Sequence, residues 1–278
     1  MGVTHDSHEG EPSSSASPAV PSAGRPASVQ PDQTLRVTVW GEGRHEQTDP
    51  AVARRYPGGM HEAVAAGIRD HLGDVEVRTA VLDDAGQGLP PSVLDATDVL
   101  VWWGHVAHEE VDDELVERLH TRVLAGMGLV VLHSGHHSKI FRRLMGTTCN
   151  LLWRNEGDRE LVWTVNPSHP IAAGVPSPLV IEAQEMYGEY FDIPTPEDLV
   201  FVSSFSGGEI FRSGCTFRRG HGKIVYFSPG DQDYPVYHHR DIRRILANSV
   251  AWSAPLGQLP GLPLVDRAPV GWFERAAP

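Results

Sequence analysis

Apolar and polar positions alternate in a regular way through the first half of the chain. Short apolar runs, each ending at a glycine or a polar loop, are separated by stretches in which apolar residues recur at helical spacing. The runs are residues 35–40, 75–82, 97–104 and 128–134, and the helical stretches are residues 59–72 and 112–125. Continuous apolar strands that alternate with helices predict a mainly parallel sheet covered by helices on both faces.

The second half of the chain is richer in strand patterns. Five runs, several of them joined by glycine-rich turns, predict antiparallel hairpins that extend the same sheet: residues 161–166, 179–183, 199–205, 209–220 and 222–230. A closing helix is predicted over residues 241–252, where apolar residues share one face.

The two ends of the chain differ from this middle part. Residues 1–34 are rich in Ser, Pro, Ala and Gly and are interpreted as a disordered tail, and residues 255–278 as a Pro-rich tail. Residues 35–254 are therefore expected to form one α/β domain. No apolar run is long enough for a signal peptide or a membrane span, so no membrane partner is expected.

Charge and cysteine content narrow the class of partner. The formal net charge is −13, which argues against a nucleic-acid partner because such binding needs a basic surface. Only two cysteines occur, Cys149 and Cys215, as expected of reduced thiols in a cytoplasmic protein. A small neutral or cationic ligand fits this chain better, and a homo-oligomer is compatible with it.

Histidines follow the predicted strands of the first half. The carboxyl ends of parallel strands meet at one edge of a sheet, where ligands usually bind. His105 and His133 come directly after apolar runs and are the preferred candidates for a general base or a metal ligand. Other histidines could be site residues or capping and surface residues: His45, His108, His136 and His137. His238 and His239 are interpreted as structural, with Asp241 as a candidate helix cap.

Two later segments add carboxylates and aromatic rings. Glu185, Tyr187 and Glu189 lie in a stretch that its Met, Tyr and Phe residues would half bury, where a carboxylate could bind metal, transfer protons or bind sugar hydroxyls. The alternative is a solvated acidic turn. Asp231 and Tyr234 lie in a loop shaped by Pro and Gly that could cover the same edge. Aromatic side chains such as Trp103 could stack on sugar rings, whereas Trp102 is expected in the core.

Long segments of the chain resemble the ThuA-like, or trehalose-utilisation, family. The segments are RVTVWGEGRHE, DVLVWWGHVAHEEV, LHSGHHSKIFRRLMGTTCNLLWR, NPSHPIAAG, EMYGEYFDIP and EIFRSGCTFRRGHGKIVYFSPGDQDYPVYHH. The resemblance runs from about residue 35 to residue 252. It implies a flavodoxin-like sheet of the class I glutamine amidotransferase type and a link to disaccharide utilisation, with 3-keto sugars as suspected substrates.

The resemblance also carries a negative implication. Where the amidotransferases present a catalytic cysteine after a strand, the matching turn here reads Leu132-His133-Ser134, so glutaminase activity is not expected. A hydrolase that uses Ser134 ranks last, because no G-x-S-x-G elbow is present. Asp231 stands where relatives tend to have histidine, so a metal site that uses that position would carry a carboxylate here.

These observations predict an enzyme that acts on a small carbohydrate by acid-base or metal-assisted chemistry, as a hydrolase, lyase or isomerase. The predicted residues are His105, His133 and Glu189 for catalysis; His45, Trp103, Tyr187, Asp231 and Tyr234 for substrate binding; and His105, His133, His136 and Glu185 for a divalent metal, zinc in first place. No nucleotide cofactor is expected, because no glycine-rich phosphate-binding motif follows a strand. The alternative is a non-catalytic sugar-binding or regulatory protein with an amidotransferase-like fold.

Overall fold

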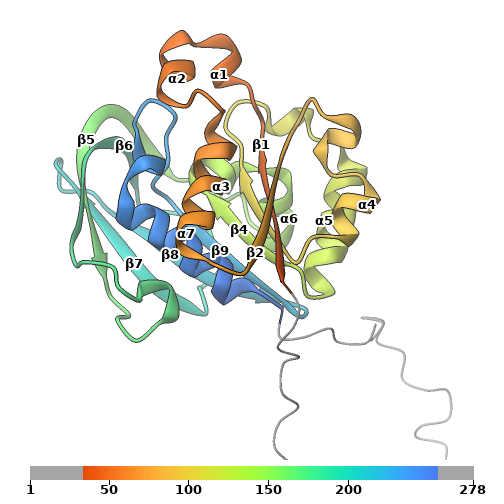
Figure 1. The fold of residues 1–278 in the computed structure, drawn as a ribbon. Helices are drawn as coiled ribbons and strands as arrows, with labels where there is room; N and C mark the ends of the chain where they lie inside the picture. The colour runs from red at the N-terminus through yellow and green to blue at the C-terminus, as the bar shows by residue number, and fades with distance from the viewer. Residues whose placement is uncertain (1–33, 256–278) are drawn as a thin grey trace, which may run out of the picture. The chain divides into compact units, whose positions relative to one another are not determined.

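The computed structural model describes residues 34–255, so the two predicted tails lie outside the described residues except for residues 34 and 255. Nine strands form one sheet in the order β2-β1-β3-β4-β9-β8-β7-β5-β6 (Figure 1). Their bounds are β1 (Leu35–Gly41), β2 (Val75–Val81), β3 (Val99–Trp103), β4 (Gly128–Leu132), β5 (Leu152–Thr164), β6 (Leu179–Gly188), β7 (Asp198–Phe205), β8 (Ile210–Arg219) and β9 (Gly222–Phe227).

The sheet has a parallel part and an antiparallel part. Strands β2, β1, β3, β4 and β9 pair in parallel, and β9, β8, β7, β5 and β6 pair antiparallel. The buried strands β3 and β4 have every residue buried, as expected of parallel strands covered on both faces. The predicted fold class, a mainly parallel α/β sheet extended by antiparallel strands, is confirmed.

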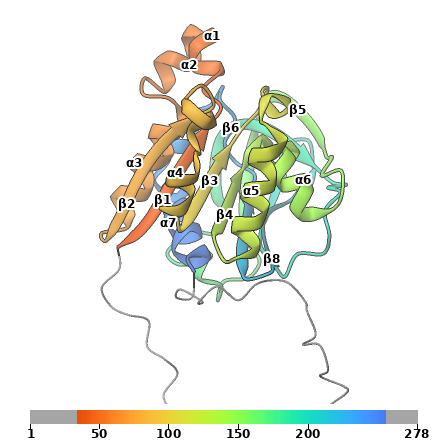
Figure 2. The ribbon, with the colours of Figure 1, turned by 90° about the vertical axis from the view of Figure 1, so that its right-hand side faces the viewer.

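Helices cover both faces of the parallel part (Figure 2). On one face α3 (Met60–His71) packs beside α7 (Arg240–Ser253), and on the other lie α4 (Pro91–Asp95), α5 (Asp113–Leu124) and α6 (Lys139–Met145). Each face has its own apolar core, the first including Ile68 and Ile245 and the second Leu119 and Phe141. Burial of these amphipathic helix faces is what holds the layers together.

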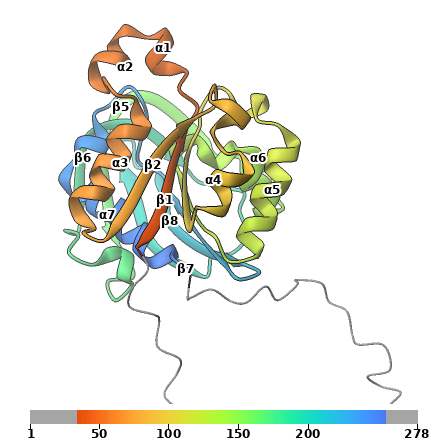
Figure 3. The same ribbon diagram turned by 45° about the vertical axis from the view of Figure 1, so that its right-hand side comes forward.

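Two short helices, α1 (His45–Thr48) and α2 (Pro50–Arg55), follow β1 at the edge where the parallel strands end (Figure 3). Helix α7 begins after His239, whose ring accepts a hydrogen bond from the backbone N–H of Asp241. The expected cap by Asp241 is therefore wrong by two residues, because an imidazole nitrogen fills the role of a capping oxygen. Among the described residues, no helix has the length and apolar character needed to cross a membrane.

The β5–β6 hairpin is one feature that sequence patterning did not predict in full. Both strands run further than the apolar runs that marked them, and the register of their pairing shifts around Asp158 and Glu160. Register shifts of this kind bend a strand. Although β6 is the last strand in the sheet order, its end contacts β8, and Tyr187 on it reaches His133 after β4. The hairpin thus contributes to the carboxyl edge of the parallel strands.

Candidate functional site

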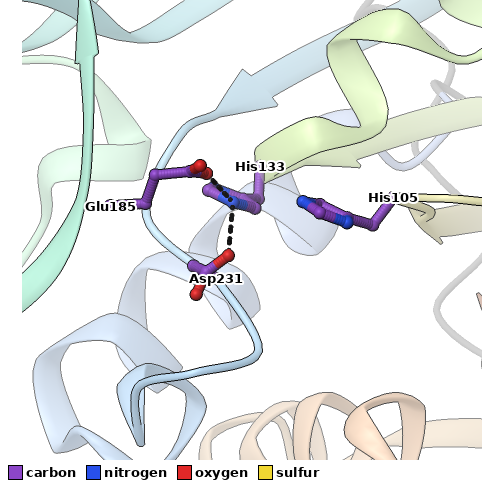
Figure 4. A group of neighbouring side chains, drawn as sticks. All are labelled: His105, His133, Glu185 and Asp231. Carbon is purple, nitrogen blue, oxygen red and sulfur yellow. Dashed lines mark ion pairs between the residues drawn. The ribbon is translucent and has the colours of Figure 1, made fainter. Parts of the chain in front are cut away.

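Four side chains from four separate segments meet at the carboxyl edge of the parallel strands (Figure 4). His105 follows β3, His133 follows β4, Glu185 lies near the end of β6, and Asp231 lies in the loop after β9. One nitrogen or oxygen atom from each side chain lies within 4.8 Å of the others. His133 and Asp231 are completely buried and Glu185 is nearly so. We call these four residues the His-carboxylate cluster.

His133 occupies a constrained position in the cluster. Its backbone φ is +49°, a conformation that non-glycine residues rarely adopt and that often marks a functional turn. Its Nδ1 atom lies 2.8 Å from the carbonyl oxygen of Ser228. Because a carbonyl can only accept, Nδ1 carries a hydrogen. The other ring nitrogen, Nε2, is thereby the atom that faces the two carboxylates.

Three oxygen atoms crowd around this Nε2 atom. Glu185 Oε2 lies 2.9 Å away, Asp231 Oδ2 3.5 Å away, and the hydroxyl oxygen of Tyr187 3.2 Å away. A single N–H cannot point at both carboxylates. Among the described residues, both carboxylate oxygens are buried without a hydrogen-bond partner of good geometry. Oxygen atoms that converge on one point without partners are what a cation site requires.

The charges of the cluster also favour a bound cation. Burial alone would lower the pKa of His133, but the Asp231 and Glu185 carboxylates outweigh it and raise this pKa to about 10. Burial would raise the pKa of Asp231, and the adjacent His133 instead holds it below its usual value. Two carboxylates in a buried site therefore favour a positive charge at Nε2, either a proton or a metal ion.

His105 is held differently. Its Nδ1 atom lies 3.0 Å from Nε2 of His45, which leaves Nε2 as its free ring nitrogen. Burial, together with the nearby positive charge of His133, lowers the pKa of His105 to about 4, so that the ring is neutral at pH 7. The backbone of this loop is bound by Glu42, which accepts hydrogen bonds from the N–H groups of residues 105–107. A neutral, fixed imidazole can accept a proton or bind a metal.

A cavity of about 330 Å³ opens beside the cluster. This volume is at the lower end of the roughly 300–1,000 Å³ typical of ligand pockets. Of the cluster, His105 and Glu185 line the cavity, whereas His133 and Asp231 do not. The remaining lining residues are His108, Ser134, His136, His137, Asn150, Leu151, Trp153, Asn155 and Tyr187. The cluster therefore presents one imidazole and one carboxylate to a ligand.

The structure brings most of the predicted site residues together. His45 supports His105, and Tyr187 stacks on His133 with ring centroids 4.7 Å apart. His136 lines the cavity, but its Nδ1 atom lies 2.7 Å from the carbonyl oxygen of Cys149, and it stands outside the His-carboxylate cluster. Tyr234 donates a hydrogen bond to Asn155, a residue of the cavity wall.

Two of the predicted site residues, Trp103 and Glu189, lie outside the His-carboxylate cluster and the cavity wall. Trp103 is 1% exposed and belongs to the core under α3 and α7, with its indole N–H donating to the carbonyl oxygen of Gly230. Strand residues alternate in direction, so Trp103 supports the Asp231 loop and does not line the cavity. Glu189 accepts two hydrogen bonds from the Arg212 guanidinium, at 2.9 Å each, and is not part of the cluster or the cavity wall.

Sequence reasoning missed Glu42, which supports the His105 loop, as well as Asn150, Leu151 and Asn155 of the cavity wall. Glu42 is 1% exposed, and both of its carboxylate oxygens accept backbone hydrogen bonds. The available signal was its place directly after β1, at the same edge as His105 and His133.

Thiol chemistry has no support in this site. Cys149 and Cys215 are free and buried, and neither lines the cavity. Burial raises the pKa of Cys149 to about 11 and that of Cys215 to about 12, so both stay protonated. Ser134 lines the cavity, but its hydroxyl donates to the carbonyl oxygen of Gly104, 2.7 Å away.

Solved structures show the same fold at low sequence identity. A ThuA-like protein from Parabacteroides merdae is 14% identical with a TM-score of 0.58, covering 83% of this chain and 94% of that chain. A cytoplasmic protein from Salmonella typhimurium is 14% identical with a TM-score of 0.51, covering 80% and 100%. PurLQS from Thermotoga maritima is 11% identical with a TM-score of 0.50, covering 79% and 99%. The expected amidotransferase-like fold is thus confirmed.

Family membership follows from sequence. No curated protein matches this chain. The model of the ThuA family, whose description is trehalose utilisation, matches residues 36–253 and so spans the predicted domain. The chain therefore belongs to the ThuA family.

Proposed function

We propose that this chain is an enzyme that acts on a sugar derived from trehalose or another disaccharide, in its 3-keto form, by moving a proton at a carbon next to the ketone. The observation that carries the proposal is the pair His105 and Glu185, which face a ligand-sized cavity from a buried cluster. The family description, trehalose utilisation, supports a sugar as the substrate class. A cytoplasmic location is part of the proposal, supported by the free cysteines and by the description of the Salmonella neighbour.

A divalent metal, zinc in first place, fits the cluster. Two imidazoles and two carboxylates are ligands that zinc accepts. The four ligand atoms lie within 4.8 Å of one another, so small side-chain movements would let all four contact one ion. The Nδ1–H of His133 is bound to a carbonyl, as is usual for a metal-bound imidazole. A bound ion would polarise the ketone oxygen of the sugar.

The residues of the chain itself divide the remaining work. His105, neutral because of its lowered pKa, can accept the proton at Nε2 when the metal is held by the other ligands, or it can serve as a ligand while Glu185 accepts the proton. Burial keeps the pKa of Tyr187 well above its ordinary value, so its hydroxyl stays protonated and can donate to a sugar oxygen. His45 fixes the ring of His105.

Acyl transfer is less well supported than proton transfer. Among residues 34–255, Ser134 is the only serine that lines the cavity, and its hydroxyl donates to a backbone carbonyl and not to a base. With both thiols protonated and away from the cavity, glutaminase chemistry lacks a nucleophile. A serine-reactive phosphonate should therefore leave the protein unlabelled.

The test is proton exchange in D2O. We expect the wild-type protein to replace the hydrogens next to the ketone of 3-keto-trehalose with deuterium, or to convert the sugar, as followed by proton NMR. Glu185→Gln should lower the rate at least 100-fold while the Kd for the sugar changes by less than about tenfold, since proton transfer acts in the transition state. Binding without exchange or conversion would favour the non-catalytic sugar-binding protein instead, and no binding would refute the sugar assignment.

A further inference from the structure

We propose that Trp153 forms a second sugar subsite, a platform for the ring linked to the one that His105 and Glu185 hold, so that the protein prefers disaccharides to single sugars. The inference rests on the proposed function and extends it from a reacting ring to the neighbouring ring. Trp153 lines the cavity and is 67% exposed. It takes no part in the His-carboxylate cluster.

The position of Trp153 follows from strand pairing. In the β5–β6 hairpin Trp153 stands directly opposite Tyr187, whose hydroxyl lies 3.2 Å from Nε2 of His133. Side chains directly opposite each other in an antiparallel pair point to the same face, with Cβ atoms about 5 Å apart. The indole of Trp153 is therefore the neighbour of Tyr187, the residue that contacts the cluster. A sugar ring joined to the reacting ring would lie beside this indole.

The residues that line the cavity differ in burial. His105, Glu185 and Tyr187 are buried or half-buried, and we assign them to an enclosed end, whereas Trp153, Asn150 and Asn155 are exposed, and we assign them to an open end. An enclosed end that reaches charged groups suits one ring, and an open end suits a ring that extends out of the cavity. A single exposed aromatic side chain is common on protein surfaces, and here it is the location in the cavity wall that gives it meaning.

The chemistry of the exposed end matches a pyranose ring. The indole face can cover the apolar C–H face of the ring, while amide groups bind its hydroxyls. Asn155 is already held in place, because Tyr234 donates to its side-chain oxygen at 2.6 Å and its side-chain nitrogen donates to Asp233 at 3.3 Å. A fixed amide beside an aromatic platform costs little conformational entropy on binding.

The chain offers a matched control on the same strand. Trp163 also lies on β5 and is 41% exposed, but its indole N–H donates to the Ser204 hydroxyl at 3.0 Å and it does not line the cavity. We would measure Kd by titration calorimetry for trehalose and glucose, each as the free sugar and as its 3-keto form. The proteins would be the wild-type chain, Trp153→Ala, Trp153→Phe and Trp163→Ala.

We expect the wild type to bind trehalose more tightly than glucose, and 3-keto-trehalose more tightly than 3-keto-glucose. Trp153→Ala should weaken the disaccharide about tenfold and leave the single sugar unchanged, Trp153→Phe should keep most of the preference, and Trp163→Ala should match the wild type. Equal Kd values for the two sugars in the wild type, or an unchanged preference in Trp153→Ala, would overturn the subsite and leave the proposed function standing. Failure of the wild type to bind any of these sugars would overturn both.

Discussion

The carboxylate of Glu42 accepts a hydrogen bond from the backbone N–H of His105 at 2.6 Å. The same carboxylate also accepts from the N–H groups of Val106 and Ala107, each at 3.0 Å. A buried side chain at the end of β1 thus fixes the loop after β3 that carries His105. The position of the cavity-facing imidazole depends on a residue that does not line the cavity.

Replacing this carboxylate should affect both stability and activity. In Glu42→Gln the amide nitrogen cannot accept, so at least one buried N–H loses its partner, at a cost of about 1–3 kcal/mol. We expect urea denaturation to show this loss and the rate of sugar proton exchange to fall about tenfold or more. Glu110→Gln is the control, because its exposed pair with Arg44 should contribute less than about 1 kcal/mol. Equal behaviour of the two variants would argue against the role of Glu42.

The ion pair of Glu189 with Arg212 is expected to stabilise the fold without taking part in the reaction. The Arg212 guanidinium more than offsets burial and holds the pKa of Glu189 below its usual value. Glu189→Gln should lower the free energy of unfolding by about 1–2 kcal/mol and leave turnover within about threefold. A loss of turnover comparable to that of Glu185→Gln, at unchanged stability, would instead assign the catalytic carboxylate to Glu189.

The buried carboxyl group of Glu160 should make the free energy of unfolding depend on pH. This side chain on β5 is fully buried, and although the Ser203 hydroxyl donates to it, burial raises its pKa to about 7. In the unfolded chain the pKa would be about 4.5, so the folded state favours the protonated form. The contribution of Glu160 to the free energy of unfolding is therefore constant below about pH 4.5 and falls as the pH rises from about 4.5 to 7. Above pH 7 it is constant again, and the total loss is about 3 kcal/mol.

The measurement is the difference in unfolding free energy between Glu160→Gln and the wild type at pH 4.5 and pH 8. We expect the variant to gain stability relative to the wild type at pH 8 but not at pH 4.5. Glu182→Gln, at an exposed position on β6, should show no such change. A difference that does not depend on pH would mean that Glu160 is ionised to the same extent in the folded and unfolded chains.

Local patterning predicted the parallel half of the fold because its inner strands are buried on both faces. Strands β3 and β4 are continuous apolar runs, and α3 and α5 show clear helical spacing. The extent of β5 and β6 could not be predicted in this way. Their ends carry mixed polar and aromatic residues, and the register shifts that bend them arise from tertiary pairing.

The site was predictable to the extent that it follows strand ends. His105 and His133 could be chosen because each directly follows a buried strand. The direction of a side chain could not be read from its neighbours in sequence, which is why Trp103 was expected in the site and lies in the core. Glu185 and Glu189 are four residues apart, yet Glu185 on β6 meets His133 and Glu189, just after β6, meets Arg212, a difference that their spacing in sequence does not predict.

The His-carboxylate cluster is proposed to hold a divalent metal in an enzyme that acts on sugars. The most direct test is the metal content of the purified, untagged full chain by elemental mass spectrometry after dialysis against zinc. We predict close to one zinc per chain in the wild type and in the exposed control His221→Ala, and little in His133→Ala and Asp231→Asn, with folding checked by circular dichroism. A folded wild-type chain that holds no metal, or variants that keep it, would contradict the claim.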